Sequence, residues 1–251
     1  SSNTSTIPLN VLTGDQSKEF AADFLITHFF NPPRYMRLLE LVTGPTTRRD
    51  VVDVIRDFCD RRLGKGVVPC KDTPGFIGNR LGVFFIQSAI NASIDLGLTV
   101  EEADAVASRP MGMPKTGIFG LLDLIGLDLM PHIAKSLAAT LPLDDTYRLI
   151  YRDQPLFQKM IAEGYTGRKG KGGFYRINKD GGGKVKESIN LQTGVYAPSD
   201  KVKLPTVDAA GKNLRALCEA PDKIGKFAWA ILSQTLLYAA SLVPQIADDI
   251  L

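Results

Sequence analysis

The chain has 251 residues, of which 44% are hydrophobic and 23% are charged, and these proportions are typical of a folded globular protein with a sizeable core. The net charge of +3 is too small to indicate a nucleic-acid-binding protein, so no nucleic acid partner is expected. No apolar run reaches the roughly 20 residues that a membrane-spanning helix needs, so no membrane span is expected. The three cysteines have no metal-ligand spacing, and they predict a reduced, cytoplasmic protein without a metal site.

The first seventy residues combine the sequence patterns of strands and of one helix. In chain order we expect strands at 24–30 and 35–43, a helix at 46–63 and a short edge strand at 66–70. Pro32 and Pro33 place a turn between the first two strands, because proline interrupts sheet pairing. Thr47 is the expected cap of the helix and Gly64 its stop. So small a sheet is predicted to be the end of a larger α/β sheet.

The sequence becomes mainly helical after Asp72. We expect helices at 74–96, 100–108, 117–138, 145–163, 208–218 and 222–251, and a strand or hairpin at 188–196. Thr73 is the expected cap of the first of these helices, with Pro74 at its first position. The sequence at 79–104 matches that at 226–251 at several positions, which indicates either an internal duplication or only the general likeness of two apolar helices.

A histidine and a glutamate are predicted to face each other across the first two strands. If these strands pair about Arg34, His28 and Glu40 lie opposite each other, because each is six residues from the turn. A carboxylate beside an imidazole fixes its tautomer and stabilises its protonated form, which is the arrangement of a general base with its orienting group. The alternative is a buried core histidine beside an exposed glutamate.

Two asparagines strengthen the catalytic interpretation. Asn31 is expected at the end of the histidine strand, and Asn79 near the start of the following helix, on a mainly apolar face. A buried amide needs a hydrogen-bond partner, and a substrate oxygen would serve. His132 has no acidic or cysteine partner at metal spacing and is predicted to be non-catalytic, whereas Cys70 is interpreted as a small buried hydrophobic residue.

Four segments in register resemble the L-3-hydroxyacyl-CoA dehydrogenase family. These are SSNTS at 1–5, THFFNPPRYMRLLELV at 27–42, CKDTPGFIGNRL at 70–81 and GRKGKGGFY at 167–175. The resemblance covers most of residues 1–176, and the tail after residue 180 is similar to the longer, multifunctional members of the family. It implies NAD-dependent oxidation of L-3-hydroxyacyl-CoA to 3-ketoacyl-CoA in fatty-acid β-oxidation.

The resemblance also implies a role for each matching residue. His28 would be the general base that takes the proton of the 3-hydroxyl group, and Glu40 would orient His28 and stabilise its charged form. Ser5 and Asn79 would hydrogen-bond the reacting substrate oxygens. Asn31 would line the same cleft, and Asn3 would lie near the nicotinamide end of the cofactor.

The implied fold is mainly α with a small α/β part. Residues 1–71 would form the end of a Rossmann-type NAD-binding sheet, and residues 72–180 the helical C-terminal domain of this family. Residues 181–251 would form a basic, glycine-rich linker and the start of a second helical copy. The implied partners are an acyl-CoA substrate, a second copy in a homodimer formed through the helical domain, and a fused enoyl-CoA hydratase in the parent protein.

One feature of the family has no counterpart in the sequence. The family opens with a strand, a glycine-rich GxGxxG turn and a helix that hold the dinucleotide, and no such motif occurs here. The first residue is not methionine, so we expect a chain cut from a longer protein. We therefore predict a chain that lacks most of the NAD-binding domain, with NAD bound mainly by sequence outside it and little or no activity alone.

Three alternatives stay open at this stage. Arg168, Lys169 and Lys171 lie in a glycine-rich segment that is either a solvated basic loop or a contact for CoA phosphates. The whole chain could be a non-catalytic helical oligomerisation module. It could also belong to a dehydrogenase that acts on another small hydroxy acid.

Overall fold

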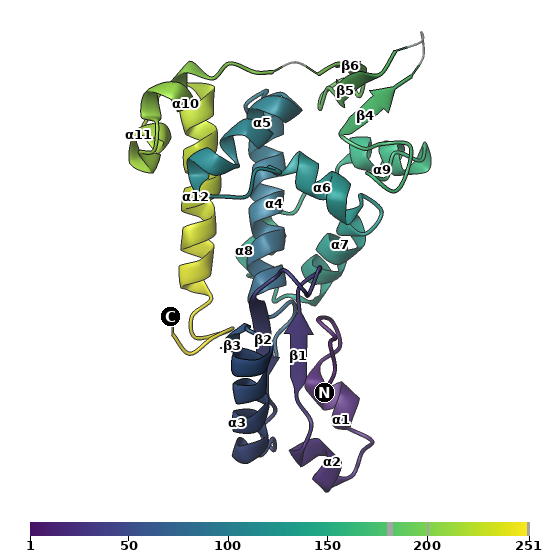
Figure 1. Cartoon of the computed structure of the whole chain (residues 1–251), viewed down its shortest axis with the longest axis vertical. Coiled ribbons are helices and arrows are strands. Elements are labelled where there is room, and N and C mark those ends of the chain that lie inside the picture. The colour runs from purple at the N-terminus through teal and green to yellow at the C-terminus, as the bar shows by residue number, and fades with distance from the viewer. Residues whose placement is uncertain (180–182, 200, 250–251) are drawn as a thin grey trace. The chain divides into compact units, whose positions relative to one another are not determined.

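A computed structural model describes residues 1–179, 183–199 and 201–249 (Figure 1). The chain divides into two compact units, one formed by Ser1–Gly82 with Leu237–Leu251 and the other by Val83–Leu236. This division differs from the three sequence segments that we predicted, whose boundaries stay predictions. No helix of the described residues is both long and apolar enough to cross a membrane.

The first unit contains a three-stranded sheet and short helices. Its elements are α1 (Leu9–Thr13), α2 (Lys18–Ala22), β1 (Ile26–Phe29), β2 (Leu38–Val42), α3 (Arg49–Asp57), the π-helical turn η1 (Phe58–Arg62) and β3 (Gly66–Cys70). The strand order is β1-β2-β3, with β1 antiparallel and β3 parallel to β2. The three predicted strands are confirmed, with shorter bounds for the first two. Ser2 also pairs in parallel with Ile26 on the other side of β1.

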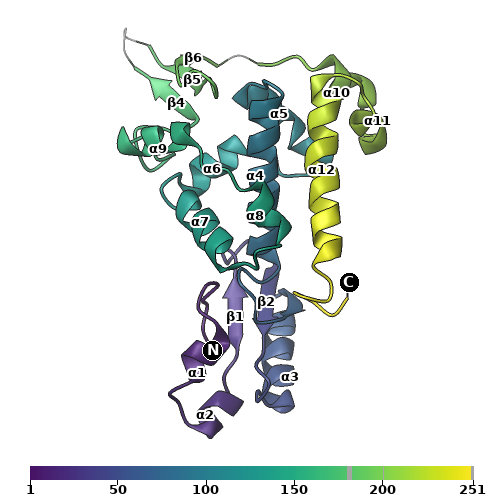
Figure 2. The same ribbon diagram turned by 180° about the vertical axis from the view of Figure 1, so that it is seen from behind.

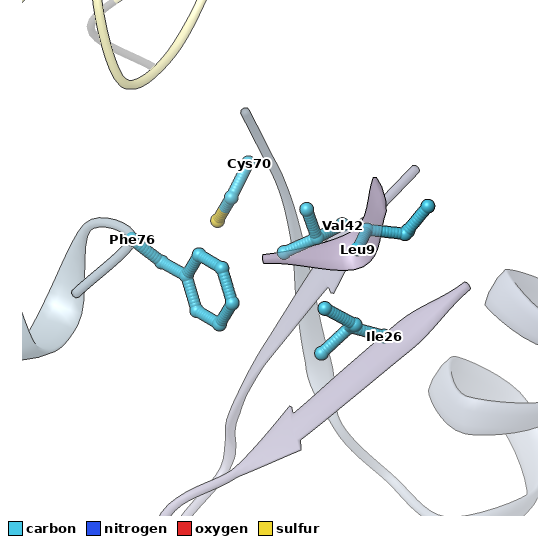
Figure 3. Close-up of a cluster of buried hydrophobic side chains, with 5 residues drawn as sticks. All are labelled: Leu9, Ile26, Val42, Cys70 and Phe76. Carbon is cyan, nitrogen blue, oxygen red and sulfur yellow. The ribbon is translucent and has the colours of Figure 1, made fainter. Parts of the chain in front are cut away.

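Apolar side chains cover both faces of this sheet. Because alternate residues of a strand point to opposite faces, Leu39 and Leu41 share one face of β2 while Glu40 and Val42 share the other. The face of Leu39 and Leu41 packs with Leu25 and Cys59 and is joined by side chains of α3. The opposite face carries a cluster formed by Leu9, Ile26, Val42, Cys70 and Phe76 (Figure 3). His28 and Glu40 therefore project from the face that carries Ile26 and Val42.

Two predicted helix caps in this unit are wrong. The predicted cap Thr47 is not the N-cap of α3, because its hydroxyl donates to the carbonyl of Phe24 and accepts from the backbone N–H of Gly44. The helix predicted from Pro74 begins at Gly78 instead, as α4 (Gly78–Asp95). Gly75 and Phe76 adopt φ values of 77° and 49°, and this left-handed turn interrupts the helix before Gly78.

The second long helix, α12 (Lys223–Ser241), ends earlier than predicted. The sequence pattern predicted a helix over 222–251, but the chain leaves the helix after Ser241 and Pro244 follows. Proline lacks the N–H that would continue the helical hydrogen bonds. The last two residues of the predicted helix, 250–251, lie outside the described residues.

The C-terminal segment is bound to the first unit by hydrogen bonds that span most of the sequence. The buried Arg80 donates from Nε to the hydroxyl of Tyr238 over 2.9 Å and from Nη2 to Oε1 of Gln245 over 3.2 Å. The backbone N–H of Lys71 donates to the carbonyl of Ile246 over 3.0 Å. This segment is thus part of the unit that contains the N-terminal sheet.

The second unit is mainly helical (Figures 1 and 2). Its other elements are α5 (Val100–Val106), the 3-10 turn η2 (Arg109–Met111), α6 (Phe119–Ile125), α7 (Met130–Thr140), α8 (Thr146–Ile150), α9 (Pro155–Ala162), β4 (Tyr175–Asn178), β5 (Val185–Ile189), β6 (Tyr196–Pro198), α10 (Pro205–Ala210) and α11 (Leu214–Cys218). Thr99 caps α5 in a capping box with Glu102. The strands form an antiparallel sheet in the order β4-β5-β6.

The predicted helices of this unit are found in place, but several are shorter or divided. The helix predicted at 208–218 is divided into α10 and α11 at Gly211, whose φ is 56°. The helix predicted at 117–138 is divided into α6 and α7 by Gly126, whose φ of 110° is not helical. The helix predicted at 145–163 is divided into α8 and α9, because Tyr151 is extended. The strand or hairpin predicted at 188–196 is confirmed in part by β5 and β6, whereas β4 was not predicted.

Candidate active site

His28 and Glu40 are buried and contact each other in the first unit. They are directly opposite each other in the antiparallel pair of β1 and β2, which confirms the predicted register. The distance from Nδ1 of His28 to Oε2 of Glu40 is 2.7 Å. His28 is 7% exposed and Glu40 is fully buried. The alternative of an exposed strand glutamate is therefore wrong.

The second carboxylate oxygen of Glu40 is held by the start of α4. Oε1 accepts from the backbone N–H of Ile77 over 3.0 Å and of Gly78 over 2.6 Å. The first N–H groups of a helix have no partner within the helix and carry the positive end of its dipole. Both oxygens of Glu40 thus have partners, so a buried carboxylate is tolerated and its orientation toward His28 is fixed.

These contacts fix the tautomer of His28. A carboxylate oxygen can only accept a hydrogen bond, so Nδ1 of His28 carries the hydrogen and donates to Glu40. In the neutral ring, Nε2 then has the free lone pair. Two aromatic rings stand edge-on to the imidazole, Phe30 with a centroid distance of 4.7 Å and Phe76 with 5.7 Å. An imidazole held in this way, with apolar side walls, can act as a general base.

Asn3 and Asn79 are connected to this pair through the backbone. Oδ1 of Asn3 accepts from the backbone N–H of Phe29 over 2.8 Å, which ties the N-terminal segment to the residue after His28. Asn79 is half-buried and follows Gly78, whose N–H holds Glu40. Within the described ranges, no hydrogen bond links Ser5 or Asn31 to His28. Ser5 is half-buried in a bend, and Asn31 is exposed in the β1–β2 loop.

The sequence patterns did not predict a role for Lys65. This residue is 7% exposed, and its Nζ donates to the carbonyl of Met36 over 2.7 Å and to that of Pro33. Nζ also lies 5.5 Å from the centre of the Phe29 ring. One buried ammonium group thus holds the β1–β2 loop, which contains Asn31. A lysine between a helix end and a strand gives no sequence signal of such a contact.

The other polar candidates have different surroundings. Burial, and after it the charge of Glu40, raises the pKa of the Cys70 thiol to about 12, so this cysteine is not an activated nucleophile. His132 is exposed on α7 in the second unit. Within residues 1–179, 183–199 and 201–249, no group of three or more His, Cys, Asp or Glu side chains could hold a metal ion.

Comparison with known families now identifies the chain. The model of the 3-hydroxyacyl-CoA dehydrogenase NAD-binding domain matches residues 1–73, and that of the C-terminal domain matches residues 75–177. The chain belongs to the 3-hydroxyacyl-CoA dehydrogenase family. The two matches meet beside the boundary that we predicted between the sheet and the helical domain.

Similar proteins extend over the rest of the chain. A putative fatty acid oxidation complex trifunctional enzyme of Rickettsia prowazekii is 42% identical over 99% of this chain and 34% of its own length. A probable 3-hydroxyacyl-CoA dehydrogenase of Bacillus subtilis is 36% identical over 100% of this chain and 32% of its own. The chain thus spans about a third of the length of these relatives. A crystal structure of 3-hydroxybutyryl-CoA dehydrogenase from Escherichia coli has the same fold, with a TM-score of 0.65 and 20% identity over 97% of this chain and 61% of that one.

The match at residues 1–73 corrects one prediction. We interpreted the missing GxGxxG turn as the loss of most of the NAD-binding domain, with the cofactor bound mainly outside the chain. The NAD-binding-domain model matches the chain from its first residue, so the domain is detected and that interpretation is not supported. The glycine-rich turn is only one part of the NAD-binding domain. The matched residues 1–73 also include β1, β2 and the His28–Glu40 pair.

Proposed function

We propose that the protein oxidises L-3-hydroxyacyl-CoA to 3-ketoacyl-CoA with NAD, as a step of fatty-acid β-oxidation. The observation that supports this most is the buried pair of His28 and Glu40, in which Nδ1 donates to the carboxylate and Nε2 is the proton acceptor. A secondary alcohol loses its hydroxyl proton and a hydride in the same reaction, so it needs a base of this kind beside it.

His28 and Glu40 act as a preset unit in this proposal. Nε2 of His28 takes the proton of the 3-hydroxyl group, and the charge that appears on the imidazole lies 2.7 Å from Oε2 of Glu40. Glu40 does not have to move, because the N–H groups of Ile77 and Gly78 hold its other oxygen. A fixed charge that faces the developing imidazolium lowers the barrier without reorganisation.

The polar residues around the pair would hold substrate and cofactor. Ser5 and Asn79 would donate to the substrate oxygens, and Asn31 would line the cleft. Asn3 suits the amide end of nicotinamide, because its Oδ1 is occupied by the N–H of Phe29 and its Nδ2 is left to donate. When bound, NAD would accept the hydride from carbon 3 of the substrate.

We also propose the partners of the protein and its location in the cell. The substrate is an acyl-CoA, the helical domain forms a homodimer, and the enzyme works in the cytoplasm. The R. prowazekii relative is named a trifunctional enzyme, and this name supports the proposal that an enoyl-CoA hydratase accompanies the dehydrogenase in the full-length protein.

A substitution of the base tests the reaction. In the full-length protein, oxidation of L-3-hydroxybutyryl-CoA is followed by NADH absorbance for the wild type and for His28→Gln. A general base contributes about 10²- to 10⁴-fold to the rate, so kcat of the variant should fall by that factor. His132→Gln is the matched control, since His132 is exposed on α7 and should leave kcat unchanged. Turnover within a few-fold of the wild type for His28→Gln would refute the role of the base.

Two further measurements separate this function from its alternatives. A non-catalytic oligomerisation module would show the dimer mass in light scattering but no turnover even in the wild type. A dehydrogenase of another hydroxy acid would turn over free 3-hydroxybutyrate or a related acid faster than its CoA thioester.

A further inference from the structure

A cleft in the second unit is lined by none of the residues that the proposed function uses. It has a volume of about 790 Å³ and lies between the end of α5, the start of α6 and the strands β4 and β5. Two buried carboxylates, Asp104 and Asp123, line it together with the half-buried Tyr175. Four exposed basic side chains line it, those of Arg109, Lys115, Arg168 and Lys186.

Both carboxylates of the cleft already accept hydrogen bonds. Asp104 accepts from the N–H of Phe119 over 2.7 Å, from the N–H of Gly120 over 3.0 Å and from the hydroxyl of Tyr175 over 2.9 Å. Asp123 accepts from the N–H of Phe174 over 2.8 Å and of Tyr175 over 2.9 Å. These donors are backbone N–H groups and the hydroxyl of Tyr175, and none of them is one of the four basic side chains.

The charges of Arg168 and Lys186 are partly offset by the carboxylate of Asp123. None of the four takes part in an ion pair among the residues that the structure describes. Lys186 is placed over the ring of Tyr175, with Nζ 4.1 Å from its centre, and the backbone N–H of Arg168 donates to the carbonyl of Asp123 over 2.8 Å. The cleft thus contains four positively charged side chains and two carboxylates, which is a local excess of positive charge. The net charge of the whole chain is only +3.

A concave surface with charges of one sign concentrates the field and attracts ions of the opposite sign. A single carboxylate or phosphate would contact one or two of these side chains, whereas charges on adjacent phosphates can pair with side chains from several elements at once. We propose that this cleft binds a small molecule that carries a diphosphate, the group shared by nucleotides and coenzyme A. Arg109, Lys115, Arg168 and Lys186 supply the positive charges.

Binding of inorganic pyrophosphate tests the proposal without any activity assay. Calorimetry should show saturable binding to the wild type that weakens as salt is raised. The double variant Lys115→Gln/Arg168→Gln should bind about tenfold or more weakly, because two charge-assisted contacts are lost. His28→Gln should bind as the wild type does, since His28 belongs to the other unit.

A second double variant separates the cleft from general electrostatics. Lys135→Gln/Lys212→Gln removes the same total charge from two exposed lysines that do not line the cleft, and should keep the wild-type affinity. All four substituted residues are exposed, and equal melting temperatures confirm that the variants fold. Equal loss of affinity in both double variants, or no saturable binding of pyrophosphate by the wild type, would overturn the proposal.

The source of the diphosphate is distinguished by three further probes. If the diphosphate alone is recognised, ADP, coenzyme A and 3′-dephospho-coenzyme A bind the wild type with similar affinity, and all three lose it in Lys115→Gln/Arg168→Gln. If the ligand is coenzyme A itself, it binds more tightly than its 3′-dephospho form. If only inorganic pyrophosphate binds and none of the three does, the cleft does not serve a diphosphate-bearing metabolite and the proposal is wrong.

Discussion

Gly78 packs so closely against Phe30 that a Cβ atom at residue 78 would lie 2.5 Å from Cζ of the ring. The same atom would lie 3.4 Å from Oε1 of Glu40, the acceptor of the Gly78 N–H. Gly78→Ala should therefore push the ring or the helix start away and lower the free energy of unfolding by about 1–3 kcal/mol, as overpacking does. Urea denaturation measures this loss.

Gly82 provides the matched control on the same helix. A Cβ atom at residue 82 meets nothing within 4 Å, so Gly82→Ala should leave the free energy of unfolding unchanged or raise it by about 0.5–1 kcal/mol through helix propensity. If the two variants are equally stable, the Phe30 ring can move away from residue 78 without any loss in the free energy of unfolding, which would contradict the prediction.

Glu40→Gln should change the tautomer of His28 without removing its neighbour. The amide oxygen of glutamine can still accept from Ile77 and Gly78, which leaves the NH₂ group to face Nδ1 of His28. Nδ1 then has to accept, and the hydrogen moves to Nε2. Nitrogen NMR of the imidazole rings reports this exchange, and His132, the other histidine of the chain, is the internal reference. An unchanged Nδ1–H signal in the variant would contradict the proposed orienting role of Glu40.

Lys65→Met should loosen the β1–β2 loop. The substitution removes the ammonium group and leaves the carbonyls of Pro33 and Met36 without their donor, a loss of about 1–3 kcal/mol in the free energy of unfolding. The amide of Met36, which donates to the carbonyl of Pro32, should exchange its hydrogen faster. Lys18→Met, at an exposed position of α2, should change neither quantity. Unaltered exchange at Met36 would show that the loop holds its shape without Lys65.

The stability of the second unit should depend on pH through Asp104. Burial raises the pKa of this carboxyl to about 6, although backbone N–H groups act in the opposite direction. A carboxyl with a raised pKa stabilises the folded state below its unfolded pKa and loses this effect as the pH rises through the folded value. Between pH 7 and pH 5 the free energy of unfolding should therefore gain about 1 kcal/mol from Asp104.

The contribution of Asp104 is isolated by comparison with Asp104→Asn. All other groups titrate alike in the two proteins, so the difference between their free energies of unfolding at pH 5 and pH 7 belongs to residue 104. A wild type that gains no more than the variant on acidification would rule out a raised pKa at this position.

The His28–Glu40 register was predictable because it depends only on the alternation of two strands and the position of one turn. The contact of Glu40 with Ile77 and Gly78 was not, since the left-handed turn at Gly75 and Phe76 moves the helix start four residues along the chain. Propensity rules favoured Pro74 as the first helical residue, and tertiary contacts overrode them. Lys65 was missed for the same reason, because its partners are carbonyl groups that lie about thirty residues away.

The bonds of Arg80 and Lys71 to Tyr238, Gln245 and Ile246 have a consequence for biosynthesis. A ribosome releases the chain from the N-terminus, so the sheet and α3 emerge long before the segment that completes their unit. Until Tyr238 and Gln245 have left the exit tunnel, the guanidinium of Arg80 cannot donate to either of them. Of the two units of this chain, the one whose synthesis begins earlier is therefore completed later.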